Sequence, residues 1–399
     1  MTHLQLAPDP RSMSPKRIGL VIGTRPEAIK VAPLIAPLVA SESLEPVVIL
    51  SGQHHQVVID VLEQFDAEYA APLLPEVPGR SLVALGAELL VAFETTFEEL
   101  DLHMVVVHGD TATAFAGGLA AYLARIPVAH LEAGLRSGSM TEPFPEEFNR
   151  VSIDSYAELC LAPTELAARN LRDEGVPGER VFITGNTVVD ALHSTLARPK
   201  PPAAPEVRRA LDHDGEVVLA TAHRRESWGT PIKMIMRAIV DIANGHPDTL
   251  FAFATHPNPV LRGQALEMLG GVDNVEILPP LPYSDLVQIL DRSVLVLTDS
   301  GGIQEEACAL NTRTLILRER TERPEAIDAG IATLVGSDRQ KIVDAASCHL
   351  AGQSHTSISD VFGDGFAAQR CVSAMLHHFG FRNRPEHFRP AIKSLDLVS

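Results

Sequence analysis

The segment from Asp299 to Glu306 combines residue types that could hold a phosphorylated ligand. Its centre, Ser300-Gly301-Gly302, follows an apolar run, Ser293 to Leu297, and leads into a helical pattern. Glycines let backbone N–H groups approach a phosphate, a helix start adds partial positive charge, and Ser300 adds a hydroxyl donor. Glu306 could then accept hydrogen bonds from a ribose. The alternative is an ordinary strand-to-helix turn, because the helix dipole favours acidic residues in a first turn.

Three more polar segments follow apolar runs, namely Gly23 to Lys30, His108 to Thr111 and His130 to Arg136. In the first of them, Gly23 permits a tight turn, Pro26 can start a helix, and Arg25 and Lys30 can reach an anion. The alternative is that both cations are solvated charges on a helix surface. Charged residues directly after Val-rich runs should lie near strand ends and rarely deep in a core.

Several acid/base groups could meet at one site. Asp110, Glu132 and the segment Pro145 to Arg150 would bring carboxylates together, and crowding would raise some of their pKa values toward general acid/base use. Salt bridges and helix caps are the alternative. His223 precedes two arginines at the end of another apolar run, where an imidazole could bind a pyrophosphate or transfer a proton, or be purely structural.

Strands alternating with amphipathic helices must position these segments. The pattern is typical of parallel sheets covered by helices on both faces, here two doubly wound halves with a ligand cleft at the carboxyl ends of the strands. A Pro-rich stretch, Arg198 to Pro205, suits a surface connection near a domain boundary. The predicted strands are Arg17–Ile22, Pro46–Leu50, Met104–Val107, Val128–Leu131, Glu158–Leu161 and Val181–Thr184, then Glu216–Thr221, Leu250–Ala254, Val275–Leu278, Val294–Leu297 and Thr314–Leu317.

Composition narrows the function classes. A chain of 399 residues is long enough for two domains. Its net charge of −18 repels polyanions, so neither a nucleic acid nor a membrane surface is an expected partner. The four scattered cysteines indicate a reducing compartment. The first 16 residues are polar and no apolar run reaches the length of a membrane span, so we expect a cytoplasmic protein.

No cofactor is expected. The sequence contains no phosphate-binding loop of the Walker type, no His-Glu-x-x-His pair, and no dinucleotide fingerprint after its first strand. The 16 histidines lack a compact metal-ligand spacing, so no metal site is predicted. Gly363 to Ala368 fits Gly-x-Gly-x-x-Ala, but it lies far from the start of either sheet and is predicted to be a turn before a C-terminal helix.

These segments together resemble the non-hydrolysing UDP-N-acetylglucosamine 2-epimerases. The resemblance runs from about Arg17 to about Gly380 and rests on ten motifs in family order. They are Gly-Thr-Arg-Pro-Glu-Ala-Ile-Lys (23–30), Gly-Gln-His (52–54), His-Gly-Asp-Thr (108–111), Glu-Ala-Gly-Leu-Arg (132–136), Pro-Glu-Glu-Phe-Asn-Arg (145–150), Gly-Asn-Thr-Val-Val-Asp (185–190), His-Arg-Arg-Glu (223–226), His-Pro-Asn-Pro (256–259), Asp-Ser-Gly-Gly-Ile-Gln-Glu-Glu (299–306) and Thr-Glu-Arg-Pro-Glu (321–325).

The resemblance implies an α/β fold with two Rossmann-like doubly wound domains in a glycosyltransferase-B arrangement, with the ligand in the interdomain cleft. We expect a flexible N-terminal segment (1–16), an N-terminal domain (17–190) and a UDP-binding C-terminal domain (191–365). A C-terminal helix, roughly Ala367–Phe379 within residues 366–385, should return to the N-terminal domain ahead of a tail (386–399). A homodimer is expected.

The implied reaction is reversible epimerisation of UDP-N-acetylglucosamine (UDP-GlcNAc) to UDP-N-acetylmannosamine (UDP-ManNAc) at carbon 2. No carbonyl acidifies the proton at that carbon, so simple deprotonation would be very costly. In the family, UDP leaves as this proton is lost, a 2-acetamidoglucal forms, and UDP adds back after protonation on the opposite face. A pyrophosphate clamp beside several carboxylates suits such a reaction, because charge developing on UDP must be stabilised.

Motif matching transfers the family's roles to particular residues of this chain. It assigns the catalytic positions to Asp110, Glu132, Glu146 and His223, and leaves open which carboxylate is base and which is acid. Glu306 would hold the ribose, and the remaining substrate contacts would come from Arg25, Lys30, Arg136, Arg150, Arg224, His256, Ser300, Gly301, Gly302 and Arg323. An allosteric site for a second UDP-GlcNAc would use Gln53, His54, Gln56 and Arg80.

Three departures from the family pattern stand out. Ser81 replaces a glutamine that helps bind the activating UDP-GlcNAc in many bacterial members, which puts the allosteric site in doubt. Ala222 replaces a glycine common before the histidine, and Phe366 stands where a lysine is frequent. Four alternatives stay open, namely an epimerase of a modified sugar such as a diacetamido uronate, a hydrolysing epimerase, a glycosyltransferase and a non-catalytic nucleotide-sugar sensor.

Overall fold

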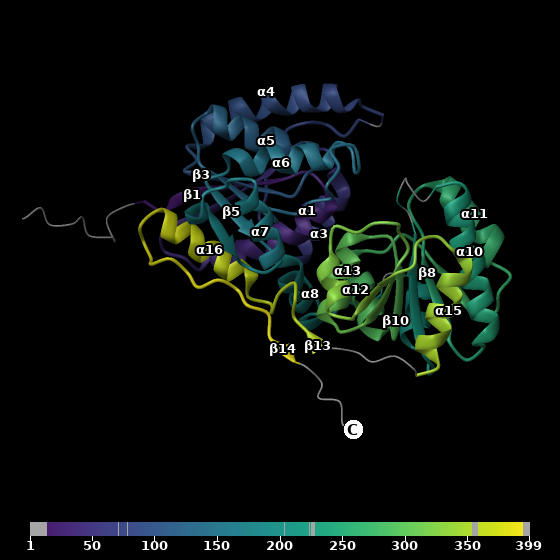
Figure 1. The fold of residues 1–399 in the computed structure, drawn as a ribbon. Coiled ribbons are helices and arrows are strands. Elements are labelled where there is room, and N and C mark those ends of the chain that lie inside the picture. Colours follow the sequence, from purple (N-terminus) through teal and green to yellow (C-terminus); the bar gives the residue numbers. More distant parts are fainter. Residues whose placement is uncertain are drawn as a thin grey trace, which may run out of the picture.

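The chain forms two parallel six-stranded sheets with helices on both faces of each (Figure 1). A computed structural model describes residues 14–70, 72–77, 79–202, 204–222, 224, 228–352 and 358–393. This architecture confirms the predicted fold class of two doubly wound α/β halves. The described helices include none that is long and apolar enough to cross a membrane.

The first sheet has the strand order β2-β1-β3-β4-β5-β6. Its strands are β1 (Lys16–Ile22), β2 (Leu44–Leu50), β3 (Met104–His108), β4 (Val128–Leu131), β5 (Leu159–Ala162) and β6 (Val181–Ile183). The four inner and C-terminal strands β3 to β6 are buried along their whole length, whereas β1 and β2 are buried only toward their carboxyl ends. The six predicted strands are therefore confirmed, with ends that differ by two residues at most.

Two helical layers cover the first sheet. One core contains residues of α1 (Arg25–Val31), α2 (Ile35–Val39), α3 (His55–Gln64), α8 (Thr187–Ala197) and α16 (Ala367–His378), with the short helix η2 (Ala32–Leu34) among them. The opposite core contains residues of α4 (Leu82–Leu100), α5 (Ala112–Leu123), α6 (Glu146–Tyr156) and α7 (Glu165–Asp173). The short helix η3 (Gly178–Arg180) leads into β6.

The second sheet has the order β12-β11-β10-β7-β8-β9. Its strands are β7 (Val217–Thr221), β8 (Leu250–Ala254), β9 (Val275–Leu278), β10 (Leu295–Thr298), β11 (Arg313–Ile316) and β12 (Ala332–Leu334). The sequence did not predict β12, a three-residue edge strand. The helices are α9 (Pro205–Leu211), α10 (Thr230–Gly245), α11 (Pro259–Leu269), α12 (Tyr283–Arg292), α13 (Gly301–Ala309), α14 (Pro324–Asp328) and α15 (Arg339–Leu350).

Each sheet has a topological switch point, where consecutive strands depart in opposite directions. In the first sheet it lies between β1 and β3, and in the second between β7 and β10. Ligands of open α/β sheets bind outside the carboxyl ends of the strands at such points. Gly23 and Gly109 follow the first pair of strands, and Ala222 and Ser300 follow the second pair. The motif segments therefore lie where this architecture places a binding site.

The C-terminal part of the chain returns to the first sheet. Helix α16 packs on α8, η2, α2 and β5, and Figure 1 shows it in yellow against the N-terminal half. Beyond it, Phe388 donates its backbone N–H to Ile183 of edge strand β6 (2.8 Å), and the Arg384 guanidinium lies 4.1 Å from the centre of the Phe182 ring. Two residues of β14 (Ile392–Lys393) then pair antiparallel with β13 (Ile358–Ser359).

Candidate active site

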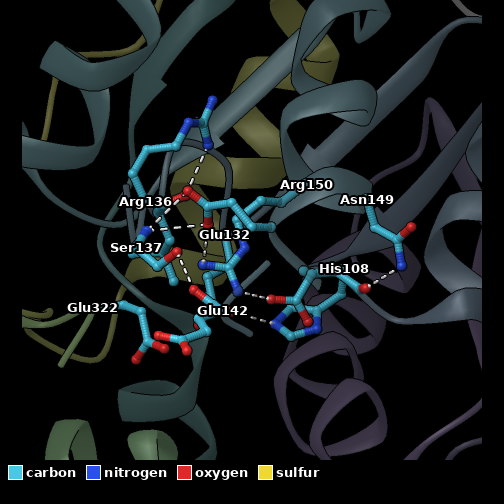
Figure 2. A network of polar contacts seen from close by, with 12 residues as sticks. His108, Glu132, Arg136, Ser137, Glu142, Asn149, Arg150 and Glu322 are labelled. Carbon is cyan, nitrogen blue, oxygen red and sulfur yellow. Dashed lines mark hydrogen bonds and ion pairs between the residues drawn. The ribbon is translucent and has the colours of Figure 1, made fainter. Parts of the chain in front are cut away.

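Asp110 lies directly after β3 and is held from two directions by helix α6. Gly109 adopts a left-handed conformation (φ 63°) that turns the chain at the end of the strand. The Arg150 guanidinium pairs with the Asp110 carboxylate, and the Asn149 side-chain amide donates to the Asp110 carbonyl (2.8 Å). Asn149 and Arg150 extend from α6 into the polar network that contains His108 (Figure 2). The Asp110 carboxylate keeps 27% of its surface exposed, so a ligand can reach it.

Glu132 lies after β4 and is buried among cations. Its backbone is left-handed (φ 67°), a conformation that non-glycine residues rarely adopt. The carboxylate pairs with the Lys30 ammonium, lies 3.3 Å from His108 Nε2, and accepts a hydrogen bond from Asn186 (2.9 Å). Burial alone would raise its pKa, but Lys30, His108 and Arg323 together bring it well below its ordinary value. Glu132 is therefore ionised here.

Lys30 joins the two halves of the molecule. Besides Glu132, its ammonium pairs with Glu305 of α13 (3.0 Å), and Glu305 in turn accepts from Arg323 (2.6 Å). Nearby, the Thr164 hydroxyl donates to Glu325 (2.6 Å). We call this contact zone the seam; it comprises Lys30, Glu132, Thr164 and Asn186 from the first half and Glu305, Arg323 and Glu325 from the second.

The seam departs from one sequence-based expectation. Glu132 is 8% exposed, although charged residues directly after Val-rich runs were predicted to lie rarely in the core. Lys30 is 5% exposed, so the alternative of a solvated charge on a helix surface does not apply to it. They are tolerated there because each has an oppositely charged partner within the buried cluster.

The adjacent carboxylates Glu146 and Glu147 at the start of α6 have different environments. Glu147 turns inward and accepts from the backbone N–H groups of Ser137 (3.0 Å) and Gly138 (3.1 Å), and it pairs with Arg150 (3.2 Å). Oε2 of Glu146 is buried, and among the described residues it has no hydrogen-bond partner. Glu147 thus fixes the helix to the turn at residues 137–138, whereas one buried oxygen of Glu146 is left without a described partner.

At the second sheet, the turn after β10 presents backbone rather than charged side chains. Ser300 is the N-cap residue of α13, and Gly301 and Gly302 form its first turn. A Cβ added at Gly301 would lie 2.5 Å from Nη1 of Arg323, whereas one at Gly302 would meet no atom of the described residues within 4 Å. Asp299, just before the turn, accepts from the Arg224 backbone N–H (2.8 Å). A helix start with this open glycine can accept an anion.

Glu306 and Arg25 lie close enough across the two halves for their charges to interact. Glu306 is buried, whereas Arg25 is half-buried. Burial raises the pKa of Glu306 to about 7, although Tyr283, Lys30 and Arg25 act in the opposite direction. Burial likewise lowers the pKa of Arg25, while Glu306 raises it. Arg25 is the first residue of α1, which follows β1 of the first sheet, and its charge interacts with Glu306 of the second half.

Comparison with known proteins identifies the family to which this chain belongs. The model of the UDP-N-acetylglucosamine 2-epimerase family matches residues 37–376. The chain belongs to this epimerase family. It is 39% identical to the UDP-N-acetylglucosamine 2-epimerase of Escherichia coli (strain K12), over 91% of this chain and 99% of that protein.

Solved structures agree with this assignment. S. aureus MnaA in a co-structure with UDP is similar with a TM-score of 0.86 and 36% identity, over 94% of this chain and 100% of that one. UDP-GlcNAc 2-epimerase from Neisseria meningitidis, bound to UDP-GlcNAc, is similar with a TM-score of 0.84 and 35% identity, over 90% of this chain and 100% of that one. The epimerase fold thus extends over both halves.

Some predicted site residues of this epimerase-family chain lie away from the seam contacts. Arg136 pairs with Asp154 (2.8 Å) and Glu174 (2.5 Å), two carboxylates outside the seam. Nδ1 of His256 accepts from the Asn258 backbone N–H (3.1 Å) just before α11. His223 lies outside the described residues, so its predicted catalytic role stays a prediction.

The residues of the predicted allosteric site follow β2 and precede α4. The Gln53 side chain accepts from Thr113 (2.8 Å), His54 donates its backbone N–H to Gly23 (2.8 Å), and Gln56 donates to Asp60 (2.8 Å). Arg80 donates to the Pro75 carbonyl (3.1 Å). The Ser81 hydroxyl accepts from Ala84 N–H (3.2 Å) and caps α4. Ser81 is therefore occupied in holding this helix.

The sequence reasoning assigned no role to several residues that build the site. Glu27 is fully buried and accepts from the Gly23 (3.0 Å) and Thr24 (2.6 Å) backbone N–H groups and from the Thr111 hydroxyl (2.5 Å). It thereby ties the turn after β1 to the turn after β3. His108, Asn186 and Glu305 also contact the central carboxylates or cations. All four lie inside segments that the sequence had singled out, which was the available signal.

Proposed function

We propose that this protein is a non-hydrolysing epimerase that interconverts UDP-GlcNAc and UDP-ManNAc at carbon 2 of the sugar. The observation that carries the proposal is that the seam joins two sheet edges which carry different kinds of group. Asp110, Glu132 and Glu146 supply carboxylates at the first sheet, and the turn from Ser300 to Gly302 supplies an anion site at the second. A reaction that moves a proton while UDP departs needs both.

In the proposed elimination, a carboxylate takes the proton from carbon 2 while the bond between carbon 1 and the UDP oxygen breaks. The electrons of the C–H bond form the double bond of a 2-acetamidoglucal, and those of the C–O bond leave with UDP. In the return step, an acid protonates carbon 2 from the other face and UDP bonds again to carbon 1. Donors aimed at the departing phosphate lower the barrier, a role for Ser300, the Gly301 and Gly302 backbone, and Arg25.

The environments of the carboxylates suggest how the work is divided. Asp110 is partly exposed and Glu146 keeps an unpaired oxygen, so we assign the proton transfers to these two. Glu132 is pinned by Lys30 and His108, so we assign it the charge balance of the site. Glu306 would accept from the ribose hydroxyls, and His223 and Arg224 would approach the pyrophosphate.

Because the proposed contacts come from both halves, we propose that residues 17–190 and 191–365 are two domains that close on UDP. Residues 366–385 return to the first of them, and a homodimer is the expected assembly. Small-angle scattering at saturating UDP should show compaction. Unchanged dimensions would contradict closure in solution.

The deciding experiment is incubation with UDP-GlcNAc in D2O, followed by NMR. We expect UDP-ManNAc to form with deuterium at carbon 2, and EDTA to leave the rate unchanged. Free N-acetylmannosamine with UDP would indicate a hydrolysing epimerase instead. Turnover of a UDP-linked diacetamido uronate but not of UDP-GlcNAc would indicate that the substrate is a modified sugar. UDP-ManNAc without deuterium at carbon 2 would exclude the elimination mechanism.

A further inference from the structure

His130 lies in β4, two residues before Glu132, and its side chain is wholly buried. Its Nδ1 is 2.6 Å from a carboxylate oxygen of Asp154 in α6. Its Nε2 is 2.8 Å from the carbonyl oxygen of Gly109, the residue before Asp110. The imidazole therefore bridges helix α6 and the turn that carries a proposed catalytic carboxylate.

Counting protons at these two contacts fixes the charge of the ring. A carbonyl oxygen only accepts hydrogen bonds, so Nε2 must carry a proton and donate it to Gly109. Asp154 also accepts from the Gly134 backbone N–H (3.2 Å) and pairs with Arg136 (2.8 Å). The Arg136 guanidinium favours the ionised form of Asp154, and an ionised carboxylate has no proton to donate, so the proton in the 2.6 Å contact is on Nδ1. The ring is then an imidazolium.

The electrostatics around Asp154 agree with this count. Burial alone would raise its pKa, but His130 and Arg136 lower it below the ordinary value. Two further titratable groups interact with Asp154, namely Tyr156 of α6 and Cys160 of β5. Burial raises the pKa of both, so neither is ionised near neutral pH. Arg136 is anchored at its outer end by Glu174 (2.5 Å).

We infer that His130 is a positioning residue which, held as an imidazolium by Asp154, fixes the Gly109–Asp110 turn for proton transfer. This inference rests on the proposed function. Helix α6 then holds the turn at three points. Asp154 acts through His130 on the Gly109 carbonyl, Asn149 binds the Asp110 carbonyl, and Arg150 binds the Asp110 carboxylate. Arg136, predicted from sequence to bind substrate, supports the outer end of this chain of contacts.

The first test reads the ring directly in the wild-type protein. Nitrogen-15 NMR of histidine-labelled protein at about pH 8 should show one ring with protons on both nitrogens, missing from the spectrum of His130→Gln. A free histidine is neutral at that pH. A singly protonated His130 would overturn the inference, and this outcome does not depend on whether the protein epimerises anything.

The second test separates positioning from folding. Asp154→Asn keeps the shape but removes the charge that stabilises the imidazolium, so His130 should lose a proton as the pH rises. We expect kcat to fall about 10²-fold at about pH 8, the scale of a misplaced catalytic group. At roughly pH 6 the loss should be smaller, and KM should stay within about twofold of wild type. Glu165→Gln, which removes an exposed carboxylate of α7 that pairs with Arg172 (2.8 Å), is the matched control and should behave as wild type.

The outcomes are distinct. Equal losses of kcat at both pH values, or a change in KM alone, would leave only a structural role for the pair and overturn the inference. Should Asp154→Asn fail to fold by circular dichroism, the wild-type NMR result decides alone. If wild-type protein shows no epimerisation, the proposed function fails, while the NMR result still decides the charge of His130.

Discussion

At the first sheet, Glu132 and Asp110 are held by protein partners, whereas the second sheet presents a short turn of open backbone after β10. Lys30, His108 and Asn186 contact Glu132, and Arg150 and Asn149 hold Asp110. Around Gly302, by contrast, there is space for a side chain that the sequence leaves out.

This difference indicates how the two halves divide their tasks. Groups that transfer protons must be oriented before the substrate arrives, because reorganisation during the reaction raises its barrier. Groups that hold an anion can stay open, because the ligand itself completes their hydrogen bonds. The first edge is thus built for chemistry and the second for binding. The following predictions challenge that division, beginning with the largest effect.

Removing a carboxylate charge from the first edge should abolish most turnover without releasing UDP. We expect Asp110→Asn or Glu146→Gln to lower kcat by about 10²–10⁴-fold, the usual range for a lost acid/base group. Glu132→Gln should also lower kcat, because it leaves the charges of Lys30 and His108 unbalanced. The UDP dissociation constant should change little, since the anion site lies on the other sheet. Calorimetry and an NMR rate assay would measure both quantities. Glu45→Gln, an exposed carboxylate of β2, is the control. Near-normal turnover in the first three variants would contradict the assignment of catalysis to the first sheet edge.

Two adjacent glycines of α13 allow a matched test of the second edge. A Cβ at Gly301 would displace the Arg323 guanidinium, which pairs with Glu305 (2.6 Å), whereas a Cβ at Gly302 meets nothing within 4 Å. Gly301→Ala should therefore lower the free energy of unfolding by about 1–3 kcal/mol. Gly302→Ala should leave it unchanged or raise it slightly, since alanine favours helices. Chemical denaturation measures both variants, and equal stabilities would mean that Arg323 moves aside freely.

Glu306 should make UDP binding depend on pH. Its pKa is raised to about 7, so the carboxylate is protonated below that pH. Ribose hydroxyls donate to the ionised form, so affinity should be full above about pH 8 and fall as the pH drops through 7, to roughly tenfold weaker at pH 6. Titrations of wild type and Glu306→Gln would be compared, because UDP itself also titrates. A variant with the same pH dependence as wild type would remove Glu306 from ribose binding.

The smallest expected effect concerns activation by a second UDP-GlcNAc. Ser81 stands in place of a glutamine and its hydroxyl already caps α4, so the activator loses a hydrogen bond worth about 0.5–1.5 kcal/mol, or roughly 2- to 10-fold in affinity. We expect the enzyme to convert UDP-ManNAc without added UDP-GlcNAc, and its rate to depend hyperbolically on the UDP-ManNAc concentration. A long lag removed by traces of UDP-GlcNAc would show that Gln53, His54, Gln56 and Arg80 suffice.

Elements with strong local patterns were predictable from the sequence. Four-residue β4 and five-residue β8 have the predicted ends, because a buried parallel strand reads as a continuous apolar run. Strand β12 was missed because Ala332–Leu334 is short and partly exposed at the sheet edge, which leaves no clear pattern. The Gly363–Ala368 segment was correctly predicted to be a turn before the C-terminal helix.

The contacts of the site were less predictable, because pairing partners come from distant segments. Sequence alone could not show that Glu146 and Glu147 point to different neighbours, since adjacent residues on a helix diverge by about 100°. It also could not show that Arg136 reaches Asp154, or that Lys30 finds two carboxylates 102 and 275 residues further along the chain. These pairings are set by tertiary packing and not by any local sequence pattern.

The return of α16 and the segment after it to the first sheet has a consequence for biosynthesis. Cys371, Met375 and Phe388 fill cores of that sheet, and Phe388 also bonds to its edge strand β6. During translation, the half that is synthesised first therefore cannot complete its cores until the last residues emerge from the ribosome. The whole second sheet is translated in between. Nascent chains released before residue 367 should expose the unfinished edge of β6 to chaperones, although every strand of both sheets has already been synthesised.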